Sequence, residues 1–181
     1  RKNEAFPEPI ITPSTKAAQG EHDESVAPSE LYKRGAVEPG LYKELARISM
    51  RLYERGVARA ADHGMIFVDT KYEFGISNGK IMLMDEVNTP DSSRYWMKDD
   101  YEARFEKGEE PRKLDKEYVR TWLSEKGFTG KGKPPKLTDD LRVEASARYM
   151  EVVEKFTGEP MQLDVGPVDK SIYSILNPFA F

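Results

Sequence analysis

The sequence predicts an α+β fold in which an antiparallel β-hairpin is flanked by helices. Apolar residues recur every three or four positions between residues 41 and 63, which is typical of a helix that buries one face. The pattern then changes to a short apolar run followed by alternation, and Asn78-Gly79 separates this segment from a second apolar run, which is typical of a hairpin. We predict that the 181 residues form a single domain.

The first part of the chain combines an irregular segment with a helix. Residues 1–30 contain prolines and glycines among polar residues and follow no period of 2 or 3.6, so we predict a loop segment here. A helix follows at Tyr42–His63, within residues 41–63, and Gly64 is placed to end it.

The predicted hairpin spans residues 65–86. Met65–Val68 is an apolar run that leads into the alternating segment Asp69–Gly75, and Ile81–Met84 forms the returning strand. Beyond the hairpin, Val87–Trp96 contains proline and serine and is predicted to be a loop. Residues 65–96 therefore form a hairpin and loop unit.

The rest of the chain is predicted to be mainly helical. Within residues 97–158 we expect helices at Asp115–Lys126 and at Asp139–Thr157, each followed by a glycine. Thr138 precedes the second helix as its N-cap. Residues 159–181 form a tail whose apolar and aromatic end is expected to pack on another surface.

Composition excludes several kinds of site and partner. The net charge is -4 and neither sign forms a long block, which argues against a nucleic-acid partner. With no cysteine and two histidines, thiolate and histidine-rich metal sites are excluded, so any metal must be held by oxygen. No apolar run approaches the roughly 20 residues that cross a bilayer, and the first residues lack the apolar segment of a signal peptide. We expect a cytoplasmic protein with no membrane partner.

Carboxylates and a lysine gather at the predicted hairpin. Asp69, Lys71 and Glu73 should share one face, because successive side chains of a strand point to opposite sides. A two-residue turn would point Asp85 away from Glu73, whereas a three-residue loop with a glycine bulge would place both on that face. We expect the bulge, since Glu73 and Asp85 could then hold Mg²⁺; a solvated sheet surface is the alternative.

The following loop concentrates groups that bind anions. The turn Pro90–Arg94 contains an acceptor, two hydroxyls and a guanidinium. Arginine suits bidentate recognition of phosphate or carboxylate, and serine hydroxyls commonly join it. On residue types alone, a turn that starts at Asp91 and carries Arg94 as a surface charge is equally consistent.

Two long stretches resemble a known enzyme family. Val68–Gly75 (VDTKYEFG) and Leu83–Trp96 (LMDEVNTPDSSRYW) are similar to the signature stretches of the SAICAR synthases, ligases of purine biosynthesis. Pro13–Lys16 with Gly20–Glu24 resembles a loop of their longer, fungal-like members. The resemblance covers about residues 8–157 and indicates the carboxy-terminal half of the family. It implies that the hairpin belongs to a larger antiparallel sheet within an ATP-binding fold.

The resemblance also implies a reaction. ATP phosphorylates the carboxylate of carboxyaminoimidazole ribotide, and the amine of aspartate then displaces phosphate from this acyl phosphate to form an amide. Glu73 and Asp85 match the magnesium-binding carboxylates, and Lys71 resembles a catalytic lysine that lies against substrate or nucleotide. The substrate-binding residues that the resemblance implies are Asp91, Ser92, Ser93, Arg94, Lys16, His22 and Asp23.

Family members run longer at the amino end, where a loop covers ATP, and no such loop precedes residue 65 here. We therefore expect an amino-terminal half in the same or another chain. Two alternatives remain open: a different ATP-dependent kinase or ligase that shares the carboxylate hairpin, and a non-catalytic ribotide- or nucleotide-binding fragment.

Overall fold

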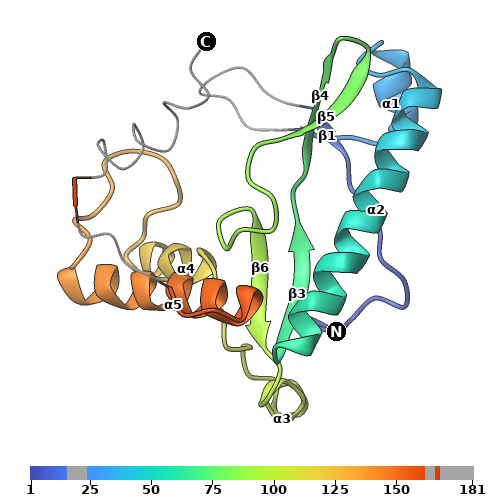
Figure 1. Ribbon diagram of the computed structural model, residues 1–181. Coiled ribbons are helices and arrows are strands. Elements are labelled where there is room, and N and C mark those ends of the chain that lie inside the picture. Colours follow the sequence, from blue (N-terminus) through green and yellow to red (C-terminus); the bar gives the residue numbers. More distant parts are fainter. Residues whose placement is uncertain (16–23, 162–165, 168–181) are drawn as a thin grey trace.

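The computed structural model describes residues 1–15, 24–161 and 166–167 (Figure 1). Helices and short antiparallel strands are mixed, as the predicted α+β class requires. The elements, in chain order, are β1 (Ser14–Thr15), β2 (Glu24–Ser25), α1 (Pro28–Lys33), α2 (Pro39–Asp62), β3 (Met65–Thr70), β4 (Glu73–Ser77), β5 (Lys80–Met84), β6 (Ser93–Met97), α3 (Tyr101–Lys107), α4 (Glu117–Glu125) and α5 (Asp139–Thr157).

The central sheet pairs two strands that are distant in the sequence. β3 runs antiparallel to β6, with Met65 opposite Met97 and Phe67 opposite Tyr95. The prediction of one hairpin over residues 65–86 is therefore wrong for its first strand, and the predicted loop at Val87–Trp96 includes most of β6. The physical reason is burial, because the aromatic and apolar residues of β6 are covered. Their packing against β3 contributes more to stability than the loop preference of the residues around Pro90.

The predicted turn at Asn78-Gly79 is confirmed. β4 and β5 pair from Ser77 and Lys80 at the turn to Glu73 and Met84 at the far end. Asn78 and Gly79 have φ values of 50° and 73°, and a two-residue turn of this kind needs positive φ at both positions. The register is regular, so the predicted bulge is wrong: the turn residues already satisfy a tight turn and need no inserted residue.

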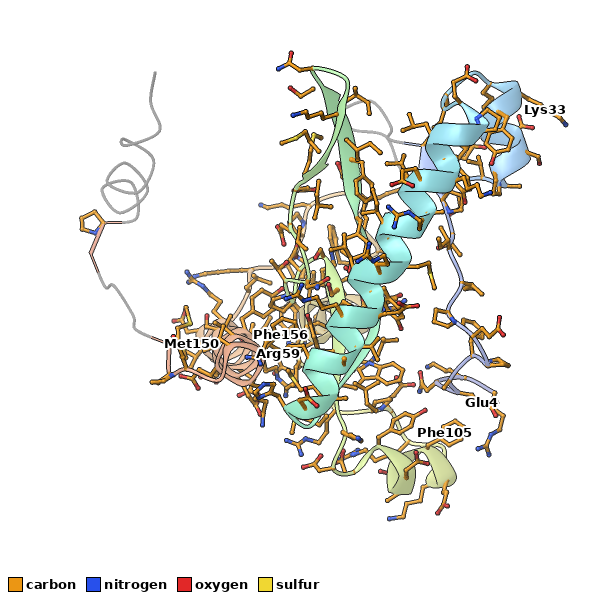
Figure 2. All side chains as sticks on the ribbon, turned by 45° about the vertical axis from the view of Figure 1, so that its right-hand side comes forward. Glu4, Lys33, Arg59, Phe105, Met150 and Phe156 are labelled. Atoms are coloured by element: carbon orange, nitrogen blue, oxygen red, sulfur yellow. The ribbon has the colours of Figure 1, made fainter. Side chains whose placement is uncertain are left out.

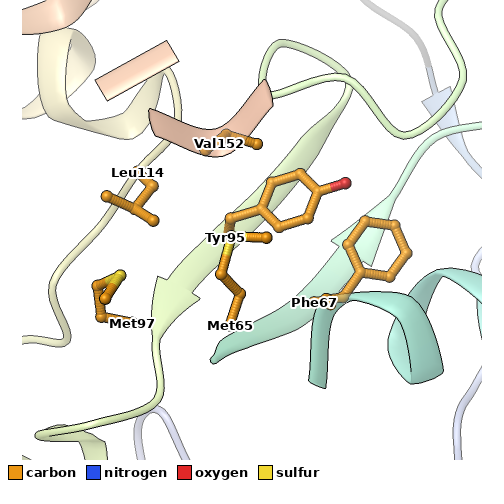
Figure 3. Packing of buried hydrophobic residues seen from close by; sticks show 7 residues of the cluster. Met65, Phe67, Tyr95, Met97, Leu114 and Val152 are labelled. Carbon is orange, nitrogen blue, oxygen red and sulfur yellow. The ribbon is translucent and has the colours of Figure 1, made fainter. Parts of the chain in front are cut away.

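The core lies where α2 and α5 meet the β3–β6 sheet. Phe67 and Tyr95 face the same side, with their ring centroids 5.0 Å apart, and Val152 of α5 joins them (Figure 3). Gly56 lets α2 approach this layer, since a Cβ atom there would lie 2.8 Å from the Phe67 ring. Burial of such apolar groups is the main favourable contribution to folding.

The three predicted helices are confirmed as α2, α4 and α5. Thr138 caps α5 as predicted, since its hydroxyl accepts a hydrogen bond from Leu141 N at 3.3 Å. Arg59 of α2 donates to the carbonyls of Phe156 and Thr157 at 2.7 and 2.8 Å, and Figure 2 shows it beside Phe156. A cation at the last carbonyls of a helix is favourable, so Arg59 fastens the end of α5 to α2.

Helices α1 and α3, which were not predicted, are only six and seven residues long. Segments this short carry too few residues to show a helical period. None of the helices in the described residues combines the length and apolarity that a bilayer crossing requires.

Candidate functional site

A polar pocket of about 290 Å³ opens where β3, β6 and the start of α4 come together. It brings together the predicted loop residues and one charged residue of β3. It also includes three residues at the start of α4 that sequence analysis did not select. The lining residues are Asp69, Asp91, Ser92, Ser93, Arg94, Lys116, Glu117 and Arg120.

Arg94 is held at the pocket by Asp69. The two residues lie opposite each other in the β3–β6 ladder, just after an irregularity between Phe67 and Asp69. Arg94 Nε donates to Asp69 Oδ1 at 2.8 Å, and Nη2 contacts the other carboxylate oxygen. This bidentate bond raises the pKa of Arg94 above its ordinary value. The guanidinium is therefore fixed in plane at the pocket, ready to bind an anion through its remaining N–H groups.

The serines of the loop are tied to the backbone around them. Lys71 N donates to Ser92 O at 3.1 Å and Ser93 N donates to Thr89 O at 2.9 Å. Ser93 is buried, and its hydroxyl lies 2.8 Å from the Thr70 hydroxyl. These bonds connect the loop to the ends of β3 and β6 and hold its backbone against the sheet.

Two tyrosines fix the start of the same loop. Tyr72 OH donates to Asn88 Oδ1 at 2.8 Å, and Tyr95 OH donates to Asn88 O at 2.6 Å. Burial raises the pKa of Tyr72 to about 12, so its hydroxyl stays protonated near neutral pH. Asn88 has φ 58°, a conformation that asparagine tolerates better than most residues. The loop therefore turns sharply at Asn88 before it reaches the pocket.

Two of the three predicted catalytic residues, Lys71 and Glu73, lie at the junction of β3 and β4, and Lys71 is hydrogen-bonded through its backbone to Ser92 of the pocket. Lys71 Nζ is 2.7 Å from Glu73 Oε1, and the Glu73 side chain is only 11% exposed. The prediction that Asp69, Lys71 and Glu73 follow one strand face does not hold, because β3 ends at Thr70 and β4 begins at Glu73. Asp69 pairs with Arg94 instead.

Asp85 directly follows β5, whose last residue Met84 is opposite Glu73. It is exposed and has φ 62°, and without the predicted bulge the regular register does not bring it onto the face of Glu73. Within the described ranges, no group of three or more histidine, cysteine or acidic side chains is arranged to hold a metal. Mg²⁺ needs only one or two protein carboxylates and completes its shell with water and phosphate oxygens, so Glu73 and Asp85 suit it chemically.

The start of α4 is anchored to β6 by a buried carboxylate. Asp115 is 1% exposed, and its two oxygens accept hydrogen bonds from Tyr95 N at 2.9 Å and Glu117 N at 2.8 Å. Burial raises the pKa of the Asp115 carboxyl, and the two N–H groups lower it only in part. Asp115 therefore holds the two sides of the pocket, β6 and α4, at a fixed separation.

Replacing Asp115 by alanine should lower the free energy of unfolding by roughly 2–4 kcal/mol, because two backbone N–H groups would lose their acceptor. Urea unfolding followed by circular dichroism measures the change. Asp139→Ala is the matched control, since Asp139 also stands at a helix start but is exposed and pairs with Arg142 at 3.4 Å. Equal stability of the two variants would contradict the anchoring role of Asp115.

Some of the predicted site residues line the pocket and others lie elsewhere. Four of them, Asp91 to Arg94, line the pocket, while Lys71, Glu73 and Asp85 lie at the neighbouring strand ends. Lys16, His22 and Asp23 lie outside the described residues. Three lining residues at the start of α4 were not predicted from the sequence: Lys116, Glu117 and Arg120. Basic residues four positions apart at the start of a predicted helix were a signal for them, but nothing local indicated that this helix meets the loop.

Comparisons with known proteins agree with the arrangement of these elements. Residues 1–136 match the sequence model of the SAICAR synthetase family. The phosphoribosylaminoimidazole-succinocarboxamide synthase of Bacteroides thetaiotaomicron is 52% identical over 161 residues, which cover 88% of this chain and 51% of that protein. This chain thus spans about half the length of such relatives.

Solved structures give the same result. The Saccharomyces cerevisiae SAICAR synthase complexed with SAICAR superposes with a TM-score of 0.70 at 36% identity, over 87% of this chain and 49% of that chain. A SAICAR synthetase in complex with ADP superposes with a TM-score of 0.62 at 27% identity, over 87% of this chain and 55% of that chain. Since the family model covers most of the chain and the fold agrees, the chain belongs to the SAICAR synthetase family.

Proposed function

We propose that this chain supplies the metal- and ribotide-binding part of an ATP-dependent ligase that joins aspartate to carboxyaminoimidazole ribotide in purine biosynthesis. The observation that supports this most directly is the pocket around Arg94, where a rigid loop carries a fixed guanidinium. A ribotide bears a phosphate, which arginine binds through paired hydrogen bonds. The relative complexed with SAICAR carries the product of this reaction.

In this proposal Arg94 and Asp91 recognise the ribotide, with Arg94 on its phosphate, and Ser92 and Ser93 shape the turn between them. Lys71 orients the reacting carboxylate or the nucleotide. Glu73 and Asp85 would hold Mg²⁺, which would neutralise charge on phosphate oxygens when bound. Charge develops on phosphoryl and carbonyl oxygens in both steps, so positioning and electrostatics are expected to provide the catalysis.

ATP is part of the proposal, and the relative in complex with ADP supports it. We further propose that the complete site needs an amino-terminal half, in the same or another polypeptide, since the relatives contain about as much sequence again as this chain matches. A cytoplasmic location fits a reaction that consumes ATP.

The test is an assay of SAICAR formation from ATP, Mg²⁺, aspartate and the ribotide, run on a preparation that contains both halves, with each component omitted in turn. Product should form only when all four are present. Turnover of another acceptor in place of the ribotide would favour a different kinase or ligase. Ribotide binding without any turnover, in a preparation that contains both halves, would favour a non-catalytic binding protein.

Replacing Arg94 by lysine should weaken ribotide binding by about 1.5–3 kcal/mol, because one ammonium group cannot reproduce a planar pair of donors. Dissociation constants for ribotide and ATP measure the effect, and ATP affinity should change little. Arg104→Lys is the matched control: like Arg94, Arg104 pairs with carboxylates, here Asp100 at 2.6 Å and Glu109 at 3.3 Å, but it lies outside the pocket. Unchanged ribotide affinity combined with weaker ATP binding would show that the assignment of Arg94 is wrong.

A further inference from the structure

The pocket lining contains three ion pairs, one between β3 and β6 and two that involve α4. Each pair joins a cation to a carboxylate of the same pocket, so the formal charges of the lining balance. The pairs are Arg94 with Asp69, Lys116 with Asp91, and Arg120 with Glu117.

The two cations of α4 are in place to share a ligand with Arg94. Lys116 is the N-cap residue of α4 and has helical φ and ψ, and Arg120 is four positions later, so the two lie on the same side of the helix. Lys116 N also donates to Pro90 O at 3.3 Å, which ties the helix start to the loop. Three cations from two distant parts of the sequence therefore surround one volume of about 290 Å³.

The two ion pairs at the start of α4 are weak enough to be exchanged for a ligand. The side chains of Lys116 and Arg120 are 42% and 65% exposed, and exposed ion pairs contribute little to stability. Lys116 Nζ lies 3.8 Å from Asp91 Oδ1, which is too long for a hydrogen bond. A phosphate or carboxylate offers several acceptor oxygens to the same donors, and such charge-assisted hydrogen bonds are strong. An anionic group in this pocket would thus gain hydrogen bonds, while breaking the internal ion pairs would cost little free energy.

We propose that Lys116 and Arg120 bind an anionic group of the ligand, opening their contacts with Asp91 and Glu117 as it enters. The ligand identity rests on the proposed function, in which two groups have this chemistry: the ribotide phosphate and the carboxylates that aspartate contributes. Both are multi-oxygen anions. The two α4 residues would then select ligands that carry the anion and reject those that lack it.

Three related compounds separate the two sources. SAICAR carries both the phosphate and the succinyl carboxylates, its riboside lacks the phosphate, and the carboxamide ribotide lacks the succinyl group. Dissociation constants for all three are measured by isothermal titration calorimetry. The protein is the preparation that forms SAICAR in the assay above, so that the wild-type site is known to be intact.

Lys116→Met and Arg120→Met should each weaken SAICAR binding by roughly 10-fold, the loss of one charge-assisted hydrogen bond. Arg120→Lys should recover part of the loss, because it keeps the charge. Lys155→Met is the control for Lys116, since Lys155 pairs with a glutamate at the same distance of 3.8 Å. Arg142→Met is the control for Arg120, since both are about two-thirds exposed and pair with an acidic residue three positions earlier. Neither control should change affinity.

If the variants lose affinity for SAICAR and the carboxamide ribotide but not for the riboside, the α4 cations bind the phosphate. If they lose affinity for SAICAR and the riboside but not for the carboxamide ribotide, the cations bind the succinyl carboxylates. Either result supports the inference. Unchanged affinities, equal losses for all three compounds, or equal losses in the controls would overturn it. If the wild-type protein itself fails to bind SAICAR, the proposed function is contradicted as well. If the wild type binds SAICAR and the variants bind it equally tightly, only the role of Lys116 and Arg120 is contradicted.

Discussion

Replacing Glu73 by glutamine should lower the rate of SAICAR formation by about 100-fold or more, with little change in ribotide affinity. Glu73 is largely covered and lies 2.7 Å from Lys71. Glutamine keeps the size of the side chain but removes the charge that would hold Mg²⁺, and the charge of the metal matters most in the transition state. Turnover numbers at saturating substrate, measured across a series of Mg²⁺ concentrations, give the size of the effect.

A second glutamate that pairs with a lysine provides the control for Glu73. Glu151 lies 3.8 Å from Lys155 on α5, away from the pocket, so Glu151→Gln removes a comparable charge without touching the site. Its turnover should match that of the wild type. A Glu73→Gln variant that keeps the full rate at every Mg²⁺ concentration would contradict the metal role.

Features of the fold that depend on neighbouring residues could be predicted from the sequence. The cap at Thr138 and the glycine that ends α5 are set by residues next to the helix, and the turn at Asn78-Gly79 is set by the two residues that adopt positive φ. The predicted bulge is wrong because Asn78 and Gly79 adopt the positive φ values of a tight two-residue turn, whatever Glu73 and Asp85 would gain from sharing a face. Local backbone preference decided the register.

Long-range pairing could not be predicted. β6 pairs with β3 across more than twenty intervening residues. The residues that flank β6 in the sequence, before Ser93 and after Met97, are of types that are common in loops. The same limit applies to the site. The loop at Asp91 was selected from its residue types and from a family resemblance, whereas Lys116 reaches the pocket only because Asp115 docks the start of α4 on β6. No local sequence pattern predicts such a contact.

The β4–β5 hairpin forms a sheet separate from the β3–β6 sheet. It is a two-stranded sheet within the described residues, and such a pair is marginally stable in water unless it packs on something else. Its apolar side chains are unusually exposed, with Ile76 at 57% and Met82 at 49%. The chain also spans about half the length of its relatives. These observations favour a larger sheet to which the hairpin adds, with a further segment that covers its apolar residues.

The 181-residue chain expressed alone should therefore form no detectable SAICAR, and turnover should appear when the remaining half of the family's length is joined or co-expressed. The pocket of about 290 Å³ is at the lower end of small-molecule sites, so it suits part of the ribotide. Phosphoryl transfer also requires a triphosphate held in line with the carboxylate, and a misplacement of about 1 Å can cost roughly 100-fold in rate. Donors from the other half would provide that alignment.

The experiment compares the chain alone, its mass and folded state verified, with the chain plus the other half, at equal concentration and with all four reactants. Equal turnover by the two preparations would show that residues 1–181 are sufficient for catalysis and that the hairpin needs no covering segment.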